Sequence, residues 1–241
     1  MRDCQRPRAW ARPGVAFLVA MGPCLTLGCA RAPAAASARA HTLVKNGASM
    51  IVQAGNPVLR GRAQEVPAER IPSPEFQALV SQMIETMREA PGVGLAAPQI
   101  GIPLRVIVLE DRASSMQKLT PLEIAERGRT VFGPRVFVNP VLMPLGEEKA
   151  TFFEGCLSVE GYTALVARST EIEVRGLDEH GAPQTWRVKG WPARILQHEV
   201  DHLDGTLYVD RMLTRSFMNG AEAKARYAGR SIASILADLG L

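Results

Sequence analysis

The sequence predicts an α+β domain with mostly antiparallel β-sheets. Three observations support this class. An amphipathic helical pattern follows residue 73, short β-branched and aromatic runs fill residues 104–190, and a second helical pattern begins at Trp191. Because the strand-like runs cluster between helices and do not alternate with them, antiparallel pairing is favoured over a parallel sheet.

The first helix is predicted to begin at Ser73-Pro74, because Ser is a preferred N-cap and Pro suits the first helical position. Apolar residues then recur at helical spacing, and the pattern ends at Pro91-Gly92. The residues of this apolar stripe are Phe76, Leu79, Val80, Met83 and Met87. They predict one buried face.

Between the helices, six runs have the composition of strands and are separated by Gly, Pro and Asp-rich turns. These runs are residues 105–109, 136–139, 151–153, 164–166, 171–174 and 185–188. Residues 171–175 (EIEVR) alternate polar and apolar side chains, which predicts a strand with one face in water. A turn is expected at residues 178–181 (DEHG).

The second helix is predicted to run from Trp191-Pro192 to a stop at Gly205. A last amphipathic stretch ends the chain and predicts a C-terminal helix. Its apolar positions are Ile232, Ile235, Leu236 and Leu239.

Length and composition describe an ordinary globular protein. The 241 residues fit one domain with extensions, and 46% apolar with 22% charged residues excludes wholesale disorder. The formal charge of +4 is misleading, because residues 1–40 alone carry +5 and the rest of the chain carries −1. The main domain is therefore near neutral, and no nucleic-acid surface is expected.

Residues 1–45 are set apart by composition and predict a targeting or processing segment, or an over-extended start. Arginine-rich residues 1–14 precede an apolar run at 15–30 that is too short for a comfortable membrane span. Three interpretations compete: an organellar transit peptide, a secretory signal whose residues 25–29 (LTLGC) resemble an imperfect lipoprotein site, and translation that really begins at Met50. Three of the four cysteines (4, 24 and 29) lie here, so the folded core must stand without disulfides.

The strongest chemical signal is residues 197–202 (QHEVDH). On a helix, His198 and His202 face the same side four residues apart and can present two imidazoles to one ion, with Glu199 beside it. The alternative is an ordinary helix with two partly buried histidines that donate to backbone carbonyls.

A catalytic metal requires a third protein ligand and an open position for water. Cys156, directly after an apolar strand and Gly155, is a better candidate than His41 near the leader or His180 in a polar turn. Without a neighbouring ligand motif, a single cysteine is more often a small, buried core residue than a metal ligand. A Cys/His/His set differs from the ligand sets of HExxH proteases.

Residues 92–101 (GVGLAAPQIG) form the third signal. Small residues allow the backbone to lie close to a bound chain, and Gln99 adds one side-chain amide. Taken alone, the segment predicts only a tight loop after a helix, because it lacks the preceding strand of a dinucleotide site and the lysine of a phosphate loop.

Together, residues 92–99, 154–158 and 197–202 resemble the three motifs of the peptide deformylase family, in order and in spacing. The resemblance extends from about residue 51 to residue 219. Flanking residues are most similar to the branch with plant and mitochondrial enzymes, including Ala90-Pro91 and Gly190-Trp191. Many bacterial members carry Pro where Glu160 stands here.

The resemblance implies a metal-dependent hydrolase that removes the N-formyl group from the N-terminal methionine of new proteins and releases formate. Cys156, His198 and His202 would hold Fe²⁺, with Zn²⁺, Ni²⁺ or Co²⁺ as replacements. Water activated by the ion would attack the formyl carbon, with Glu199 as general base and then acid.

The resemblance also implies roles for several other residues. The Gln99 amide and the Leu157 backbone N–H would stabilise the oxyanion. Gly92, Val93 and Gly94 would pair with the extended substrate backbone, which predicts little discrimination among the second and third substrate residues.

An ion pair between Arg168 and Asp201 is likewise implied, and it would join the segment with Cys156 to the ligand helix. We expect loss of the Asp201 charge to leave Arg168 unpaired.

The resemblance also implies mostly antiparallel β-sheets packed around a central, metal-binding helix with the HExxH motif, within a catalytic domain at residues 46–219. The segment 1–45 before this domain and the predicted helical tail at 220–241 after it lie outside the resemblance. The expected partners are N-formyl-Met nascent polypeptides at the ribosome exit, without specific nucleic acid or stable membrane insertion. The bacterial cytoplasm is the first expectation for location, with mitochondrion, plastid or a lipoprotein-like anchor as alternatives. Two other classes stay open: a zinc endopeptidase of the HExxH type and a non-catalytic, metal-stabilised binding module.

Overall fold

The computed structural model describes residues 44–45, 48–90, 92–117 and 119–241. The expectations for residues 1–43, including the leader, its three cysteines and His41, lie outside these ranges. Within the described ranges, no helix has both the length and the apolar character needed to cross a bilayer.

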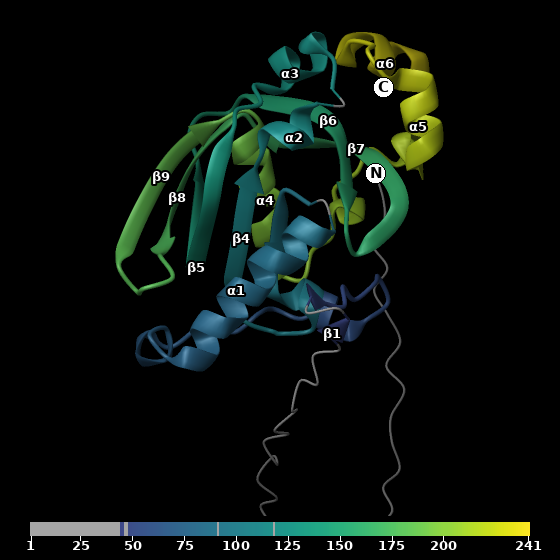
Figure 1. Cartoon of the computed structure of the whole chain (residues 1–241). Helices are drawn as coiled ribbons and strands as arrows, with labels where there is room; N and C mark the ends of the chain where they lie inside the picture. Colours follow the sequence, from purple (N-terminus) through teal and green to yellow (C-terminus); the bar gives the residue numbers. More distant parts are fainter. Residues whose placement is uncertain (1–43, 46–47, 91, 118) are drawn as a thin grey trace, which may run out of the picture. The chain divides into compact units, whose positions relative to one another are not determined.

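The larger sheet has five strands in the order β3-β4-β5-β8-β9, and every neighbouring pair is antiparallel (Figure 1). This confirms the predicted antiparallel class. The strands are β3 (Gly94–Ala96), β4 (Val106–Asp111), β5 (Phe132–Pro144), β8 (Glu171–Leu177) and β9 (Pro183–Lys189).

A second antiparallel sheet has the order β10-β7-β6. Its strands are β6 (Lys149–Cys156), β7 (Val159–Ser169) and β10 (Met218–Asn219). The short pair β1 (Val44–Lys45) and β2 (Ala48–Ser49) forms a third. Because β3 and β6 are both edge strands, each has one side that pairs with no other strand of the described chain.

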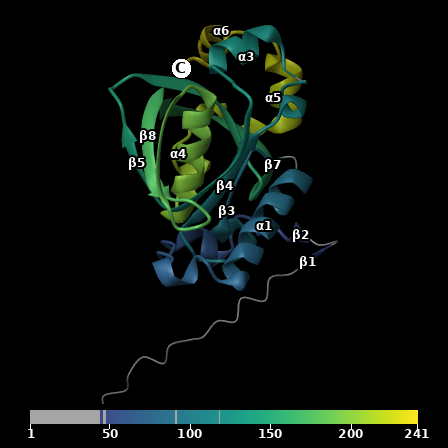
Figure 2. The same cartoon turned by 60° about the vertical axis from the view of Figure 1, so that its left-hand side comes forward.

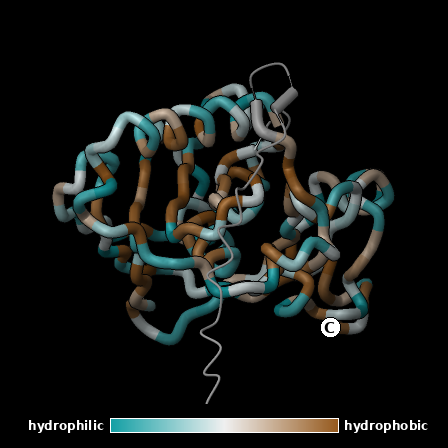
Figure 3. The backbone as a smooth tube through the Cα atoms, turned by 90° about the horizontal axis from the view of Figure 1, so that it is seen from below, coloured by the Kyte–Doolittle hydropathy of each residue, from teal (hydrophilic) through white to brown (hydrophobic). Residues whose placement is uncertain are grey.

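Both faces of β4 are buried, and each face packs on a different helix. Val106 and Val108 join the cluster around α1 (Pro74–Glu89), whereas Ile107 and Leu109 join the cluster around α4 (Trp191–Leu203). Successive side chains of a strand point to opposite faces, so one apolar run serves two cores. Figure 3 shows hydrophobic stretches along the strands and hydrophilic stretches at many of the bends.

Helix α1 forms as its sequence predicts. The Ser73 hydroxyl accepts a hydrogen bond from the N–H of Phe76, and Pro74 occupies the first helical position. The whole predicted apolar stripe is buried.

Helix α4 lies in the middle of the fold, against the five-stranded sheet (Figure 2), and it also contacts β7 of the smaller sheet. This confirms the prediction of sheets packed around an HExxH helix. The helix stops just before Gly205, whose φ is +75° and where a Cβ would lie 2.6 Å from the Arg60 carbonyl oxygen. Only glycine fits this turn.

Three local predictions were wrong or incomplete. Residues 94–96 are strand β3, because their backbone pairs with β4 although their side chains are small. Glu173 on β8 is buried, not wet, because the side chains of Arg175 and Arg187 lie over its carboxylate. Helices α2 (Ala113–Met116) and α3 (Pro121–Arg127) interrupt the stretch expected to hold only strands.

The C-terminal residues form α5 (Gly220–Tyr227) and α6 (Ile232–Leu239), near α3 and the smaller sheet (Figure 1). Tyr227 and Ile235 pack on Leu165 of β7 in a small apolar core. Single 3₁₀ turns complete the described chain: η1 (Pro57–Arg60), η2 (Ala68–Arg70), η3 (Ala97–Ile100), η4 (Tyr208–Asp210) and η5 (Thr214–Ser216).

Candidate metal centre and active site

The structure brings together the three residues that the sequence offers as metal ligands. Cys156 ends strand β6, and His198 and His202 lie one turn apart on α4. One potential ligand atom from each lies within 4.8 Å of the other two, and Cys156 Sγ is 3.2 Å from His202 Nε2. His180 is not part of this group, and its side chain is 75% exposed.

His198 is oriented by Glu154. Its Nδ1 lies 2.9 Å from Glu154 Oε2, which leaves Nε2 as the ring nitrogen available to an ion. The Nδ1 of His202 is buried and has no hydrogen-bond partner in the part of the chain that the structure describes. Burial, the largest cause, holds the pKa of His202 well below its usual range. The imidazole of His202 therefore stays neutral, as a metal ligand must be.

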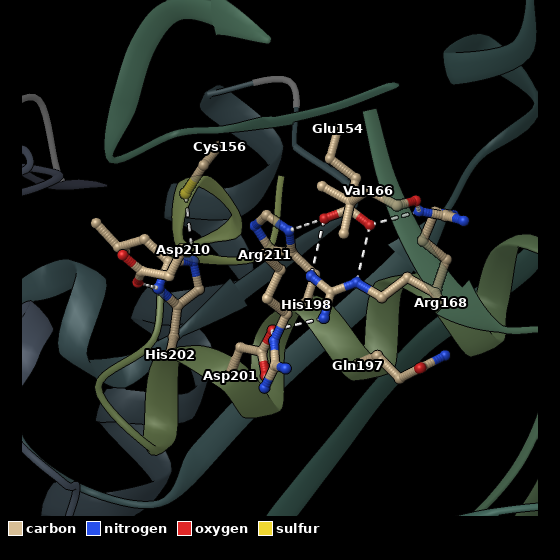
Figure 4. A network of polar contacts seen from close by, with 12 residues as sticks. Glu154, Cys156, Val166, Arg168, Gln197, His198, Asp201, His202, Asp210 and Arg211 are labelled. Atoms are coloured by element: carbon tan, nitrogen blue, oxygen red, sulfur yellow. Dashed lines mark hydrogen bonds and ion pairs between the residues drawn. The ribbon is translucent and has the colours of Figure 1, made fainter. Parts of the chain in front are cut away.

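Glu154 is the centre of a buried charge network (Figure 4). Its carboxylate accepts two hydrogen bonds from Arg168, at 3.0 and 2.9 Å, and one from Arg194 at 2.6 Å, in addition to the contact with His198. Burial disfavours this charge, but the hydrogen bonds from His198 and Arg168 outweigh burial and lower the pKa of Glu154 well below its usual range.

Asp201 extends the network to the last turn of α4. Its Oδ2 lies 2.5 Å from Arg168 Nη1, so the pair implied by the resemblance is present. Arg211 also binds the same carboxylate through two contacts of 2.7 Å. Removal of the Asp201 charge would therefore not leave Arg168 unpaired, contrary to expectation, because Glu154 still binds that guanidinium.

Glu199 is buried beside the three ligands. Its Oε2 has no hydrogen-bond partner among the described residues. Burial raises the pKa of Glu199 to about 7, so the carboxyl can both accept and release a proton near neutral pH. A Cβ on Gly94 would lie 2.3 Å from Glu199 Oε1, so only glycine leaves room for this carboxylate.

The side chain of Gln99 is oriented so that its amide nitrogen faces Cys156. Gln99 Oε1 accepts a hydrogen bond of 2.8 Å from the N–H of Ala96, and Nε2 lies 3.5 Å from Cys156 Sγ and 3.4 Å from Ser158 Oγ. Leu157 follows Cys156 in a turn, so its backbone N–H lies next to the sulfur ligand in sequence.

A cavity of about 720 Å³ is lined by four of these residues, Gln99, Cys156, His198 and Glu199. Gly92, Val93 and Gly94 line one part of it, and the β6 segment 152–156 lines another. Cavities of this size typically hold a small organic ligand or a few residues of a peptide.

The donor set fits a divalent transition metal. One thiolate and two imidazoles suit Fe²⁺, Zn²⁺, Co²⁺ or Ni²⁺, and no fourth His, Cys, Asp or Glu of the described residues joins them. The unpartnered Glu199 oxygen points to an additional polar group, such as a water, in the same space.

The sequence interpretation gave no role to Glu154, Arg194 or Arg211. Glu154 was inside a quoted motif, two residues before Cys156, but no local pattern shows that it contacts His198. Arg194 lies on the buried face of α4, one turn before His198. A charged residue is unusual on a buried helix face, and this position was the signal from which a buried ion pair could have been predicted.

Comparison with known proteins places these motifs together in one family. The family model described as polypeptide deformylase matches residues 48–217. The chain is 52% identical over 167 residues to the chloroplastic peptide deformylase 1A of Solanum lycopersicum, covering 69% of this chain and 60% of that protein. It is 43% identical over 171 residues to the mitochondrial peptide deformylase of Homo sapiens, covering 71% of this chain and 70% of that protein.

Solved structures are similar as well. A class I type b peptide deformylase from Acinetobacter baumannii with bound Met-Ala-Ser has a TM-score of 0.60 and 34% identity, covering 67% of this chain and 96% of that chain. The matched part spans only 60% of the Solanum lycopersicum protein and 62% of the related Arabidopsis thaliana protein.

Proposed function

The chain belongs to the polypeptide deformylase family, and on this premise we propose that it is a peptide deformylase. It removes the N-formyl group from the N-terminal methionine of newly synthesised proteins and releases formate. The observation that carries this proposal is the convergence of Cys156, His198 and His202 beside the buried Glu199 carboxylate.

Cys156, His198 and His202 hold one divalent ion, which is Fe²⁺ in this proposal, with Zn²⁺, Ni²⁺ or Co²⁺ as replacements. When bound, such an ion would supply a Lewis acid that makes water more acidic near neutral pH. The thiolate ligand makes such a site sensitive to oxidation.

Glu199 moves the proton. Hydrolysis forms a C–O bond from water to the formyl carbon and breaks the C–N bond, so the methionine nitrogen must gain a proton as it leaves. Glu199 takes that proton from the attacking water and delivers it to the amine. Its burial supports this role, because it raises the pKa of the carboxyl to about 7, so that the group can accept a proton and then release it.

Gln99 and Leu157 stabilise the oxyanion that develops on the formyl oxygen. The Gln99 Oε1 contact with the N–H of Ala96 fixes the amide, so Nε2 is left as the donor. One such donor contributes about 3 kcal/mol to transition-state stabilisation.

The substrate backbone lies extended beside Gly92, Val93 and Gly94. These residues lead into β3, whose free edge can accept an added strand, and all three line the cavity. The Acinetobacter baumannii protein, which binds Met-Ala-Ser, supports a peptide as the ligand.

The partners in this proposal are formylated nascent polypeptides at the ribosome exit, and the catalytic domain needs neither nucleic acid nor a membrane. The bacterial cytoplasm is the proposed location. Mitochondrion, plastid or a membrane anchor would follow from a functional leader in residues 1–45, and N-terminal sequencing of the natural protein distinguishes these cases.

The decisive experiment is release of formate from formyl-Met-Ala-Ser by the anaerobically Fe²⁺-loaded protein. We expect formate and free Met-Ala-Ser in equal amounts. Absence of formate from protein with full metal content would contradict the proposal. Cleavage of internal bonds in an unformylated peptide would instead support the endopeptidase class.

A further inference from the structure

The cavity with the candidate active site continues well beyond the metal ligands. It reaches the C-terminal helices, where Ala228 and Ile232 line it, and α3, where Leu119 precedes the helix and also lines it. Residues beyond 217 lie outside the stretch matched by the family model. This wall is therefore formed partly by the chain's own C-terminal extension.

The cavity wraps around the edge of β6. The consecutive residues 152–156 all line it, although successive side chains of a strand point to opposite faces. One cavity can touch all of them only where it opens along the strand's free edge, and β6 is an edge strand. A peptide that lies along this edge also sends its side chains alternately to the two faces.

The two faces of this edge differ. On the inner face, Phe152 packs edge-on against Trp191 of α4, with ring centroids 6.4 Å apart, and Glu154 reaches the ligand His198. On the outer face, Phe153 stacks on Tyr227 of α5, with ring centroids 5.8 Å apart. The inner face thus leads to the metal ligands and the outer face to the C-terminal helices.

The helical wall is fixed in place by polar contacts. The hydroxyl of Tyr227 donates a hydrogen bond of 2.9 Å to Asp238 of α6, which joins α5 to α6. The backbone N–H of Ile232 donates to Glu126 of α3 at 3.4 Å. Ile232 is half-buried at the cavity surface and Ala228 is exposed there, so both present apolar atoms to a ligand.

We propose that this wall selects an apolar side chain at the second residue of the substrate, with Ile232 as a specificity-determining residue. This inference rests on the proposed function. With the formyl group at Glu199 and the methionine side chain on the inner face near Phe152, strand alternation directs the second side chain outward, toward Phe153 and the helical wall. The expectation of little discrimination at that residue rested on backbone pairing with residues 92–94, which takes no account of the C-terminal helices.

The experiment measures kcat/KM for formyl-Met-Leu-Ser and formyl-Met-Asn-Ser with the full-length, metal-loaded protein. Leu and Asn are similar in size, so the comparison isolates polarity. We expect the Leu peptide to be favoured by at least about tenfold, the usual scale for discrimination by an apolar pocket. Ile232→Ser should reduce this preference to less than about threefold, and Ile232→Leu should preserve it.

Leu236→Ser is the matched control, because Leu236 lies on the same helix, is also half-buried and does not line the cavity. It should keep the wild-type preference. Ala228→Asp adds a charge to the wall at an exposed position without removing core atoms, so it should lower the preference for the Leu peptide. This variant keeps the inference testable if Ile232→Ser fails to fold.

Equal kcat/KM for the two peptides in the wild type would overturn the inference, as would an equal loss of preference in Leu236→Ser and Ile232→Ser. Both outcomes leave the proposed function intact, because formate is still released. Failure of the proposed function is distinct, since then neither peptide is deformylated.

Discussion

Glu154 Oε2 lies 2.9 Å from Nδ1 of His198, and the same carboxylate binds the guanidinium groups of Arg168 and Arg194. One acidic side chain thus orients a candidate metal ligand and accepts hydrogen bonds from two buried arginines. Both functions depend on a single charge.

Glu154→Gln should destabilise the fold and weaken metal binding. Arg168 and Arg194 are each about 5% exposed or less, so loss of their shared carboxylate leaves buried positive charge and costs about 3–5 kcal/mol. Urea unfolding and competition with a chelator measure the two effects. Glu147→Gln, at an exposed position, is the control, and an unchanged unfolding midpoint in Glu154→Gln would contradict this account.

Asp201→Asn should have a smaller effect, about 1–2 kcal/mol. Arg168 keeps both of its contacts with Glu154, and the second partner of Asp201, Arg211, has a side chain that is 50% exposed. Urea unfolding of the two variants in parallel gives the comparison. A loss for Asp201→Asn as large as that for Glu154→Gln would show that Asp201, not Glu154, is the main partner of Arg168.

Glu199→Gln should retain metal and lose catalysis. The amide keeps the shape of the side chain and leaves the three ligands in place, but it cannot shuttle a proton, so kcat should fall at least ~10²-fold. Metal analysis and formate release test this together, with Glu85→Gln on the exposed face of α1 as a helical control. Retained turnover would remove Glu199 from the mechanism.

Cys156→Ser should lose the metal, because an alcohol is mostly protonated and is a poor ligand compared with thiolate. Metal content after gel filtration is the measurement. His180→Ala should have no effect on it, since the His180 side chain is exposed and away from the ligand group. Full metal content in Cys156→Ser would place the third ligand elsewhere.

Gly94→Ala should reduce kcat/KM by at least about tenfold, since small displacements of catalytic groups have large effects. The added methyl would lie 2.3 Å from Glu199 Oε1 and must displace that carboxylate. Gly133→Ala is the control, because a Cβ there meets no atom within 4 Å. If both variants have wild-type kcat/KM, the position of Glu199 does not depend on Gly94.

The elements that could be predicted from sequence have local signals. Helices α1 and α4 could be predicted because each begins with an N-cap residue or a Pro, has apolar residues at helical spacing, and is followed by a glycine. Helix α3 was missed although Thr120 and Glu123 form a reciprocal capping box, a signal that sequence reasoning can use. Strand β3 could not be predicted, because Gly94–Ala96 have little intrinsic preference for strands and extend only by pairing with β4.

The same distinction applies to the site. The two histidines share a helix, so their spacing indicates that they converge, and Cys156 was the best remaining candidate for a third ligand. The Glu154 network was missed because Arg194 is 40 residues away from it in the chain, and such a contact leaves no periodic trace. The buried Glu173 was missed because only tertiary packing places arginine side chains over it.

The separation of Cys156 and His202 by 46 residues bears on the order of events during biosynthesis. The chain is made from its N-terminus, so β6 and its thiol leave the ribosome before the ligand helix exists. The ligands can meet only after β7, β8, β9 and α4 have been made, and closing so long a segment carries an entropic cost that the packing of α4 must offset. Binding of an ion by all three candidate ligands must therefore follow synthesis of α4, and until then Cys156 has neither imidazole beside it.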